Sequence, residues 1–78
     1  MGEKVREIRL RLGLTQQKMF ELLKQQGAEI YVGYIGSYEI DERIPTTLVT
    51  LAYARAAGIP METLVDDELD LPKKLQPK

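Results

Sequence analysis

The chain has 78 residues, 44% of them apolar, which suffices for one small domain with a modest core. It contains no Cys and no His, and its single serine has no base to activate it. These absences exclude disulfides and thiolate zinc sites and argue against enzymatic activity, so we expect no metal and no cofactor. No apolar run resembles a signal peptide or a membrane span, so a soluble cytoplasmic protein is expected.

Two helices are predicted in the first third of the chain. Residues 3–12 repeat apolar side chains at the spacing of one helix face, and Gly13 ends the pattern. Thr15 is a good N-cap for a second amphipathic helix, which Gly27 ends. Residues 1–24 carry six basic and three acidic side chains, so a phosphate-facing surface would draw on these two helices.

Residues 31–39 leave two interpretations open. Gly33 and Gly36 each cost roughly 1 kcal/mol relative to Ala inside a helix. The alternation of aromatic and β-branched residues would also suit a strand. We favour a helix because one face is then apolar, formed by Tyr31, Tyr34, Ile35 and Tyr38. The opposite face carries Val32, Gly33, Gly36 and Ser37.

The next predicted helix, capped by Thr46 or Thr47 and ended by Gly58, is apolar almost all the way round. Arg55 is its only charge. Such a helix lies either at the centre of the fold or at a subunit interface. For the second case, a homodimer would form through Leu48, Val49, Ala52, Tyr53 and Ala56.

A short fifth helix is predicted after Pro60. Residues 67–78 are acidic and then basic, with too few apolar groups to fold alone, so we expect a polar, solvated tail. Leu69 and Leu71 could alternatively dock on a neighbouring subunit. The sequence thus predicts one all-α domain over residues 1–66, followed by the tail.

Three stretches of this pattern match a known family in the correct order. VREIRLRLGLTQQKM has an Arg on the first helix, then Gly, an apolar residue, Thr and Gln, and it resembles the opening of the Cro/lambda-repressor-like, or Xre-type, helix–turn–helix family. YIGSYE with the loop to Pro45 is similar to the family's third helix and its exit, and LAYARAAGIPMETL to its last two helices. The resemblance covers about residues 3–66. The matching positions of the first two stretches are Arg9, Gly13, Leu14, Thr15, Gln16, Ile35, Tyr38, Glu39 and Pro45.

The chain departs from the family pattern in three places. Phe20 stands where a small residue is usual, and Asp41 replaces the usual Gly after the third helix. The connection between the second and third helices is also longer than the common pattern.

The resemblance implies a compact five-helix bundle of lambda-repressor-like type, in which Arg9 and Glu39 form a structural ion pair. It also implies phosphate contacts from Gln16 and Gln17 at the start of the second helix, and we expect a further one from Arg43. The base-reading positions map to Val32, Gly33 and Ser37. None of these three can make a bidentate contact with a base, although Val32 could touch a thymine methyl.

Two functions follow from different classes. The first is a homodimeric, sequence-specific regulator of transcription that binds double-stranded DNA with its third helix in the major groove. The alternative is a protein-interaction module with the same fold and weak or lost DNA readout. The low positive charge, the glycine-rich third helix and the apolar fourth helix favour this alternative.

Overall fold

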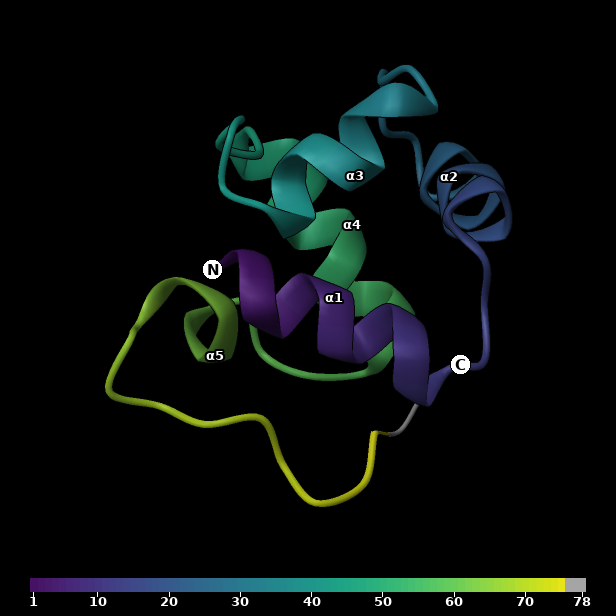
Figure 1. Cartoon of the computed structure of the whole chain (residues 1–78). Coiled ribbons are helices and arrows are strands. Elements are labelled where there is room, and N and C mark those ends of the chain that lie inside the picture. Colours follow the sequence, from purple (N-terminus) through teal and green to yellow (C-terminus); the bar gives the residue numbers. More distant parts are fainter. Residues whose placement is uncertain (76–78) are drawn as a thin grey trace.

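The chain forms five helices in this computed structural model, which describes residues 1–75 (Figure 1). They are α1 (Gly2–Arg11), α2 (Gln16–Gln25), α3 (Gly33–Glu39), α4 (Thr47–Ala57) and α5 (Glu62–Val65). The described residues contain no strand, so the all-α prediction is confirmed and the strand interpretation of residues 31–39 is wrong. None of these helices is long and apolar enough to cross a membrane.

Threonine caps and a glycine stop set several helix ends, as predicted. The Oγ1 atom of Thr15 accepts a hydrogen bond from the backbone N of Lys18 at 3.1 Å, and Thr46 Oγ1 accepts one from Val49 at 3.3 Å. A cap of this kind is worth about 1 kcal/mol. Gly58 ends α4 in the left-handed conformation, with φ 70°, which residues with a side chain rarely adopt. The bounds of α4 are therefore encoded locally.

The third helix begins later than the predicted stretch. Tyr31 lies before its first turn and is 73% exposed, so its expected place on the buried face is wrong. The helical spacing that put Tyr31 on this face does not apply outside the helix. Ile30 is buried beside it instead. The remaining residues of the predicted face are inside, with Ile35 and Tyr38 buried and Tyr34 half-buried.

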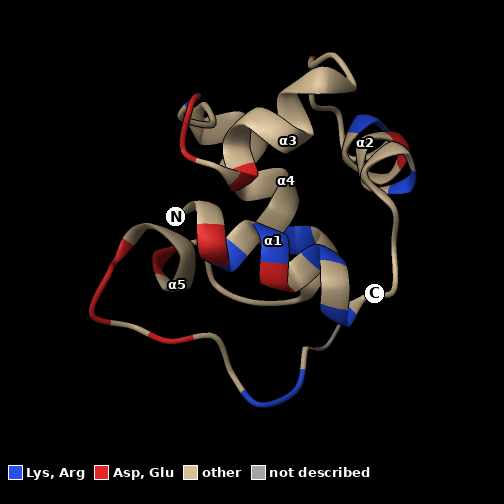
Figure 2. Cartoon of the chain, in the orientation of Figure 1, with Lys and Arg blue, Asp and Glu red and all other residues tan. Residues whose placement is uncertain are grey.

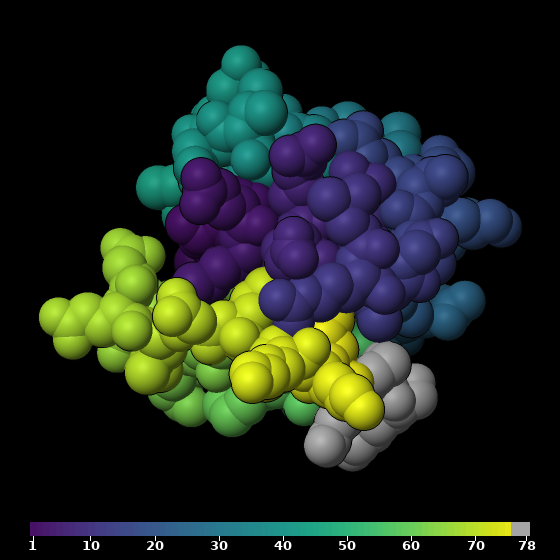
Figure 3. All heavy atoms as spheres, turned by 60° about the horizontal axis from the view of Figure 1, so that its bottom comes forward, coloured from purple at the N-terminus to yellow at the C-terminus, as the bar shows by residue number. Residues whose placement is uncertain are grey.

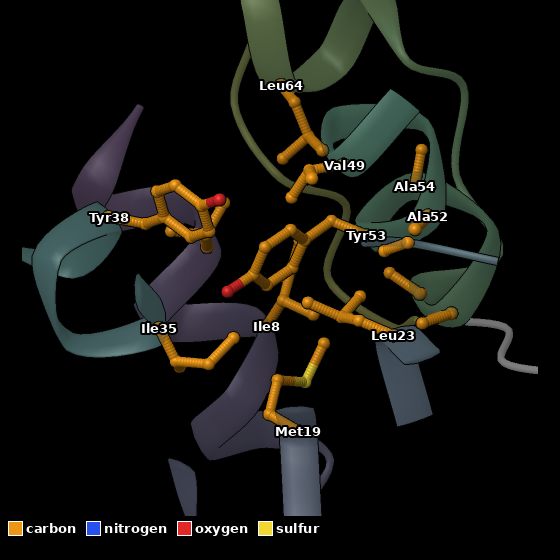
Figure 4. Close-up of a cluster of buried hydrophobic side chains, with 14 of the residues drawn as sticks. Ile8, Met19, Leu23, Ile35, Tyr38, Val49, Ala52, Tyr53, Ala54 and Leu64 are labelled. Carbon is orange, nitrogen blue, oxygen red and sulfur yellow. The ribbon is translucent and has the colours of Figure 1, made fainter. Parts of the chain in front are cut away.

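The fourth helix lies at the centre of the fold, and its side chains fill the core (Figure 4). Tyr53 is fully buried among side chains from the other helices, including Ile8, Leu23 and Leu64. Four small residues of α4 let neighbouring helices approach closely, namely Ala52, Ala54, Ala56 and Ala57. The result is a globule of 28 × 25 × 19 Å. Central placement therefore explains the apolar character of this helix.

Four of the five residues expected at a subunit interface are buried inside one chain. The exposed fractions of Val49, Ala52, Tyr53 and Ala56 are 0–5%, because α1, α2 and α5 already cover them. Leu48, at 71%, is the one member of this group on the surface. The expected interface is thus wrong at four positions, and any dimer would have to use Leu48 with other surface residues.

A close contact joins the start of α1 to the end of α3. Asp41 adopts a left-handed conformation, with φ 60°, and its Oδ1 accepts a hydrogen bond from the backbone N of Gly2 at 3.0 Å. A Cβ on Gly2 would lie 2.7 Å from the carbonyl oxygen of Tyr38, so glycine is required there. Asp41, which departs from the family pattern, lies just after the end of α3 and therefore caps the start of α1.

The described part of the tail packs along α1 and is not fully solvated (Figure 3). Arg11 Nη1 donates to the carbonyl oxygen of Pro72, and Leu71 and Leu75 pack against the core. Leu69 stays exposed. The expectation of a solvated tail is therefore wrong for Leu71 and Leu75, while Leu69 and the charged residues do face solvent. The final part of the predicted tail, residues 76–78, lies outside the described residues.

Candidate nucleic-acid interface

A buried ion pair fixes α3 against α1. Arg9 donates from Nε to Glu39 Oε2 at 2.7 Å and from Nη2 to Oε1 at 3.1 Å. The side chains of Arg9 and Glu39 are only 13% and 4% exposed. The hydrogen bond to Glu39 raises the pKa of Arg9 above its ordinary value, although burial acts in the opposite direction. The structural pair implied by the family resemblance is thus present, with the bidentate geometry that makes such pairs strong.

The start of α2 lies against the side of α3. Gln16 Nε2 donates a long hydrogen bond of 3.4 Å to Glu39 Oε1. A Cβ added to Gly36 would lie 3.4 Å from the same nitrogen, which is ordinary van der Waals contact, so the Gln16 side chain lies directly against α3. Gln17 is exposed beside it. Thr15 caps one of the free amides of the first turn, and those of Gln16 and Gln17 have no acceptor within the helix.

The outer face of α3 is smooth and uncharged. It consists of Val32, Gly33, Gly36 and Ser37, and the charge-coloured view shows this helix without Lys or Arg (Figure 2). The hydroxyl of Ser37 donates to the carbonyl oxygen of Gly33 at 3.4 Å, so part of its hydrogen-bonding capacity is used inside the helix. A Cβ on Gly33 would meet no atom within 4 Å, so the backbone there is open to an approaching surface.

Arg43 lies on the other flank of α3, where it stacks on an aromatic ring. Its guanidinium carbon is 3.8 Å from the centroid of the Tyr34 ring, and its backbone N donates to the carbonyl oxygen of Ser37 at 3.2 Å. Tyr31 meets the same ring edge-on, with centroids 5.4 Å apart and planes at 81°. Tyr34 therefore orders an exposed cation and an exposed aromatic ring beside the outer face of α3.

Of the six predicted DNA-binding residues, Val32, Gly33 and Ser37 lie at or in α3, Gln16 lies against α3 through Glu39, and Arg43 stacks on Tyr34 of α3. Gln17 is exposed next to Gln16 at the start of α2. The sequence interpretation did not include Tyr31 and Tyr34 among the DNA-binding residues, because it placed both on the apolar face of the third helix. The adjacent Ile30 was the available clue, since it offered another buried anchor just before Tyr31.

Few free cations surround this surface. Lys18 lies 3.7 Å from Glu21, and Lys24 lies over the Phe20 ring, 5.5 Å from its centroid. Two exposed carboxylates, Asp41 and Glu42, precede Arg43. Electrostatic attraction to a polyanion at this face is therefore modest.

No known protein family, no curated protein and no solved structure matches this chain. A function has to be inferred from the chain's own residues.

Proposed function

We propose that the chain is a DNA-binding regulator of transcription with a helix–turn–helix of lambda-repressor-like type, formed by α2 and α3. The outer face of α3 carries this proposal. It is open and uncharged, and it lies between the start of α2 and the stacked Arg43. An α-helix measures about 10–12 Å across and the major groove is about 12 Å wide, so this face can approach the base edges.

Phosphate groups would contact both flanks of α3. On one side, the first turn of α2 offers the amides of Gln16 and Gln17 and the positive end of the helix dipole. On the other side, the guanidinium of Arg43 is already ordered by Tyr34, so less side-chain freedom is lost on binding. Because few further free cations lie near this surface among residues 1–75, phosphate binding would be sufficient for modest affinity only.

Fluorescence anisotropy with random-sequence duplex DNA at several salt concentrations tests the proposal. Each phosphate contact should contribute about −0.9 to the slope of log affinity against log salt concentration. Arg43→Ala removes one phosphate contact and should therefore reduce the magnitude of the slope by about 0.9. Lys73→Ala removes the same charge from the tail on α1 and is the matched control. Absence of binding at low salt would contradict the proposal.

We further propose that the chain acts as a homodimer, because paired helix–turn–helix units read two half-sites. As a regulator of transcription, it would act in the cytoplasm. Leu48 is available for the interface, together with Ile40 and Ile44 from the connection between α3 and α4, all of them well exposed. Sedimentation at high concentration should show a dimer that Leu48→Glu dissociates and Leu10→Glu, on α1, does not. A strictly monomeric wild-type chain would refute the dimer.

The same exposed aliphatic residues favour a second candidate, a protein-interaction module. Ile40, Ile44 and Leu48 are 65%, 84% and 71% exposed within one short stretch of the chain, and exposed aliphatic side chains that gather in a patch mark interaction sites. Such a module would bind no duplex DNA at low salt, and binding to its partner would be lost in Ile44→Ser. In both cases we propose a binding role and no catalysis, because the lone Ser37 has no neighbouring base.

A further inference from the structure

We infer that Tyr31, Val32 and Gly33, here called the reading edge, recognise the 5-methyl group of thymine in the major groove. This inference rests on the proposed function, since it names the feature of DNA that the α2–α3 surface distinguishes. It assigns Tyr31 a binding role and makes Tyr34 a positioning residue.

The reading edge is exposed at the N-terminal end of α3, which is the end that would meet the bases if α3 lay in the major groove. Tyr31 and Val32 are 73% and 43% exposed and lie side by side in the chain at the start of α3. Gly33 adds no side chain, and the space around its Cα is open. The edge therefore presents an aromatic ring and an isopropyl group to an incoming surface, with backbone that a base pair can approach closely.

Tyr31 is held in place before any partner arrives. Its ring meets the Tyr34 ring edge-on at 5.4 Å, and Tyr34 meets the buried Tyr38 ring at 6.2 Å. Arg43 stacks on Tyr34 as well. An exposed side chain tied to the core in this way loses little rotational freedom on binding, which favours a contact role over free solvation.

The chemistry of the edge selects one feature of DNA. Bases are usually distinguished by Arg, Lys, Asn or Gln in the major groove, and the outer face of α3 has none of them. The single hydroxyl on this face, that of Ser37, donates to Gly33. Thymine is the one standard base with an apolar group in the major groove, and an apolar pair such as Tyr31 and Val32 gains free energy by burying it.

Replacing thymidine by deoxyuridine tests this inference, because the two differ only in the methyl group. Anisotropy is measured with two otherwise identical duplex pools, one with thymine and one with uracil. Wild-type affinity should fall about four-fold for each methyl contacted. Val32→Ala and Tyr31→Ala should bring the affinity ratio of the two pools towards one. Val65→Ala is the matched control, because Val65 is 51% exposed on α5, away from α3 (Figure 1).

The outcomes separate this inference from the proposed function. Equal binding of both pools by the wild type would overturn methyl recognition and leave DNA binding intact. A thymine preference that survives in Val32→Ala and Tyr31→Ala would also overturn it, since the methyl would be read elsewhere. Binding of neither pool at low salt would overturn the proposed function itself. Tyr34→Ala should weaken the thymine preference, whereas Tyr34→Phe, which keeps the ring, should preserve it.

Discussion

The third and fourth helices follow one another in the chain but are fixed by different forces. α4 has seven buried residues and is held by apolar contact with the helices around it. α3 buries only Ile35, Tyr38 and Glu39, and one of these is charged. Its position depends on directional bonds, from Arg9 and Gln16 to Glu39 and at the contact between Gly2 and Asp41.

This difference explains how α3 can present an open outer face. A helix held mainly by burial needs a wide apolar surface, which leaves little of its circumference free. A helix held by a bidentate ion pair needs only one narrow side. The polar contacts with α1 therefore leave the glycine-rich side of α3 available for a partner.

The largest expected effect is the loss of the buried ion pair. Glu39→Ala leaves Arg9 buried without a counter-charge and should lower the free energy of unfolding by about 4 kcal/mol, measured by urea denaturation. Glu7→Ala is the matched control, because it breaks the exposed pair with Arg11 and should cost less than about 0.5 kcal/mol. Equal losses in the two variants would show that the buried pair has no special role.

A double variant, Arg9→Met with Glu39→Met, sharpens this test. Since both charges are removed together, the loss should be smaller than for Glu39→Ala alone. Amide hydrogen exchange should show that Glu39→Ala deprotects α3 more than α4, as expected if the pair holds α3 in particular. Uniform deprotection of both helices would contradict the contrast between them.

The apolar packing that holds α4 is tested by a substitution that creates a cavity in the core. Leu23 on α2 is fully buried against the α4 side of the core, and Leu23→Ala should lower the free energy of unfolding by about 3 kcal/mol. Leu10→Ala, at an exposed position on α1, should cost less than about 0.5 kcal/mol. In this variant, protection of the α4 amides from hydrogen exchange should fall together with that of the whole chain, because the contacts of α4 form the shared core.

Local sequence features were sufficient to predict much of α4 and little of α3. The cap at Thr46, the stop at Gly58 and the all-round apolar pattern define the bounds and the apolar character of this helix without knowledge of its neighbours. The sequence did not decide between a central helix and a subunit interface, because burial within a chain and burial between chains leave the same composition. Only the arrangement of the other helices distinguishes them.

The candidate site depends on contacts that have no local spacing. Gly2 and Asp41 are 39 positions apart, and Gln16 and Glu39 are 23 apart, so neither contact appears as a pattern in the sequence. The exposure of Tyr31 was missed for a related reason. Helical periodicity predicts faces only where the helix has begun, and here the buried Ile30 and the late start of α3 move Tyr31 to the surface.

A smaller effect is expected at the cap that joins α3 to α1. Asp41→Ala removes the acceptor for the Gly2 amide, and it leaves alanine, which has no polar side chain, at φ 60°. Together these effects should lower the free energy of unfolding by about 1–2 kcal/mol. Asp41→Gly loses the cap but relieves the backbone, so it should cost less. Asp41→Asn keeps an oxygen acceptor and should cost least. Any other order of the three, measured by urea denaturation, would contradict the capping role.

The smallest expected effect has the opposite sign, because a buried side-chain oxygen in the described part of the core lacks a hydrogen-bond partner. The hydroxyl of Tyr53 has no hydrogen-bond partner among the described residues. Tyr53→Phe removes this group and keeps the ring, which should raise the free energy of unfolding by about 1 kcal/mol at neutral pH. Tyr31→Phe, which changes an exposed hydroxyl, should leave it unchanged.

The pH dependence of Tyr53→Phe provides a second readout. Burial raises the pKa of Tyr53 above its ordinary value, and the nearby Glu39 carboxylate raises it further. Because the folded state holds the proton more tightly, the stability linked to this group is complete below about pH 10, the ordinary value for tyrosine, and is lost as the pH rises further. Tyr38, whose pKa is also raised by burial, is present in both proteins and contributes the same loss to each. The stability difference between Tyr53→Phe and the wild type should therefore widen in alkaline solution. A constant difference across this range would mean that the Tyr53 hydroxyl is hydrated in the folded chain.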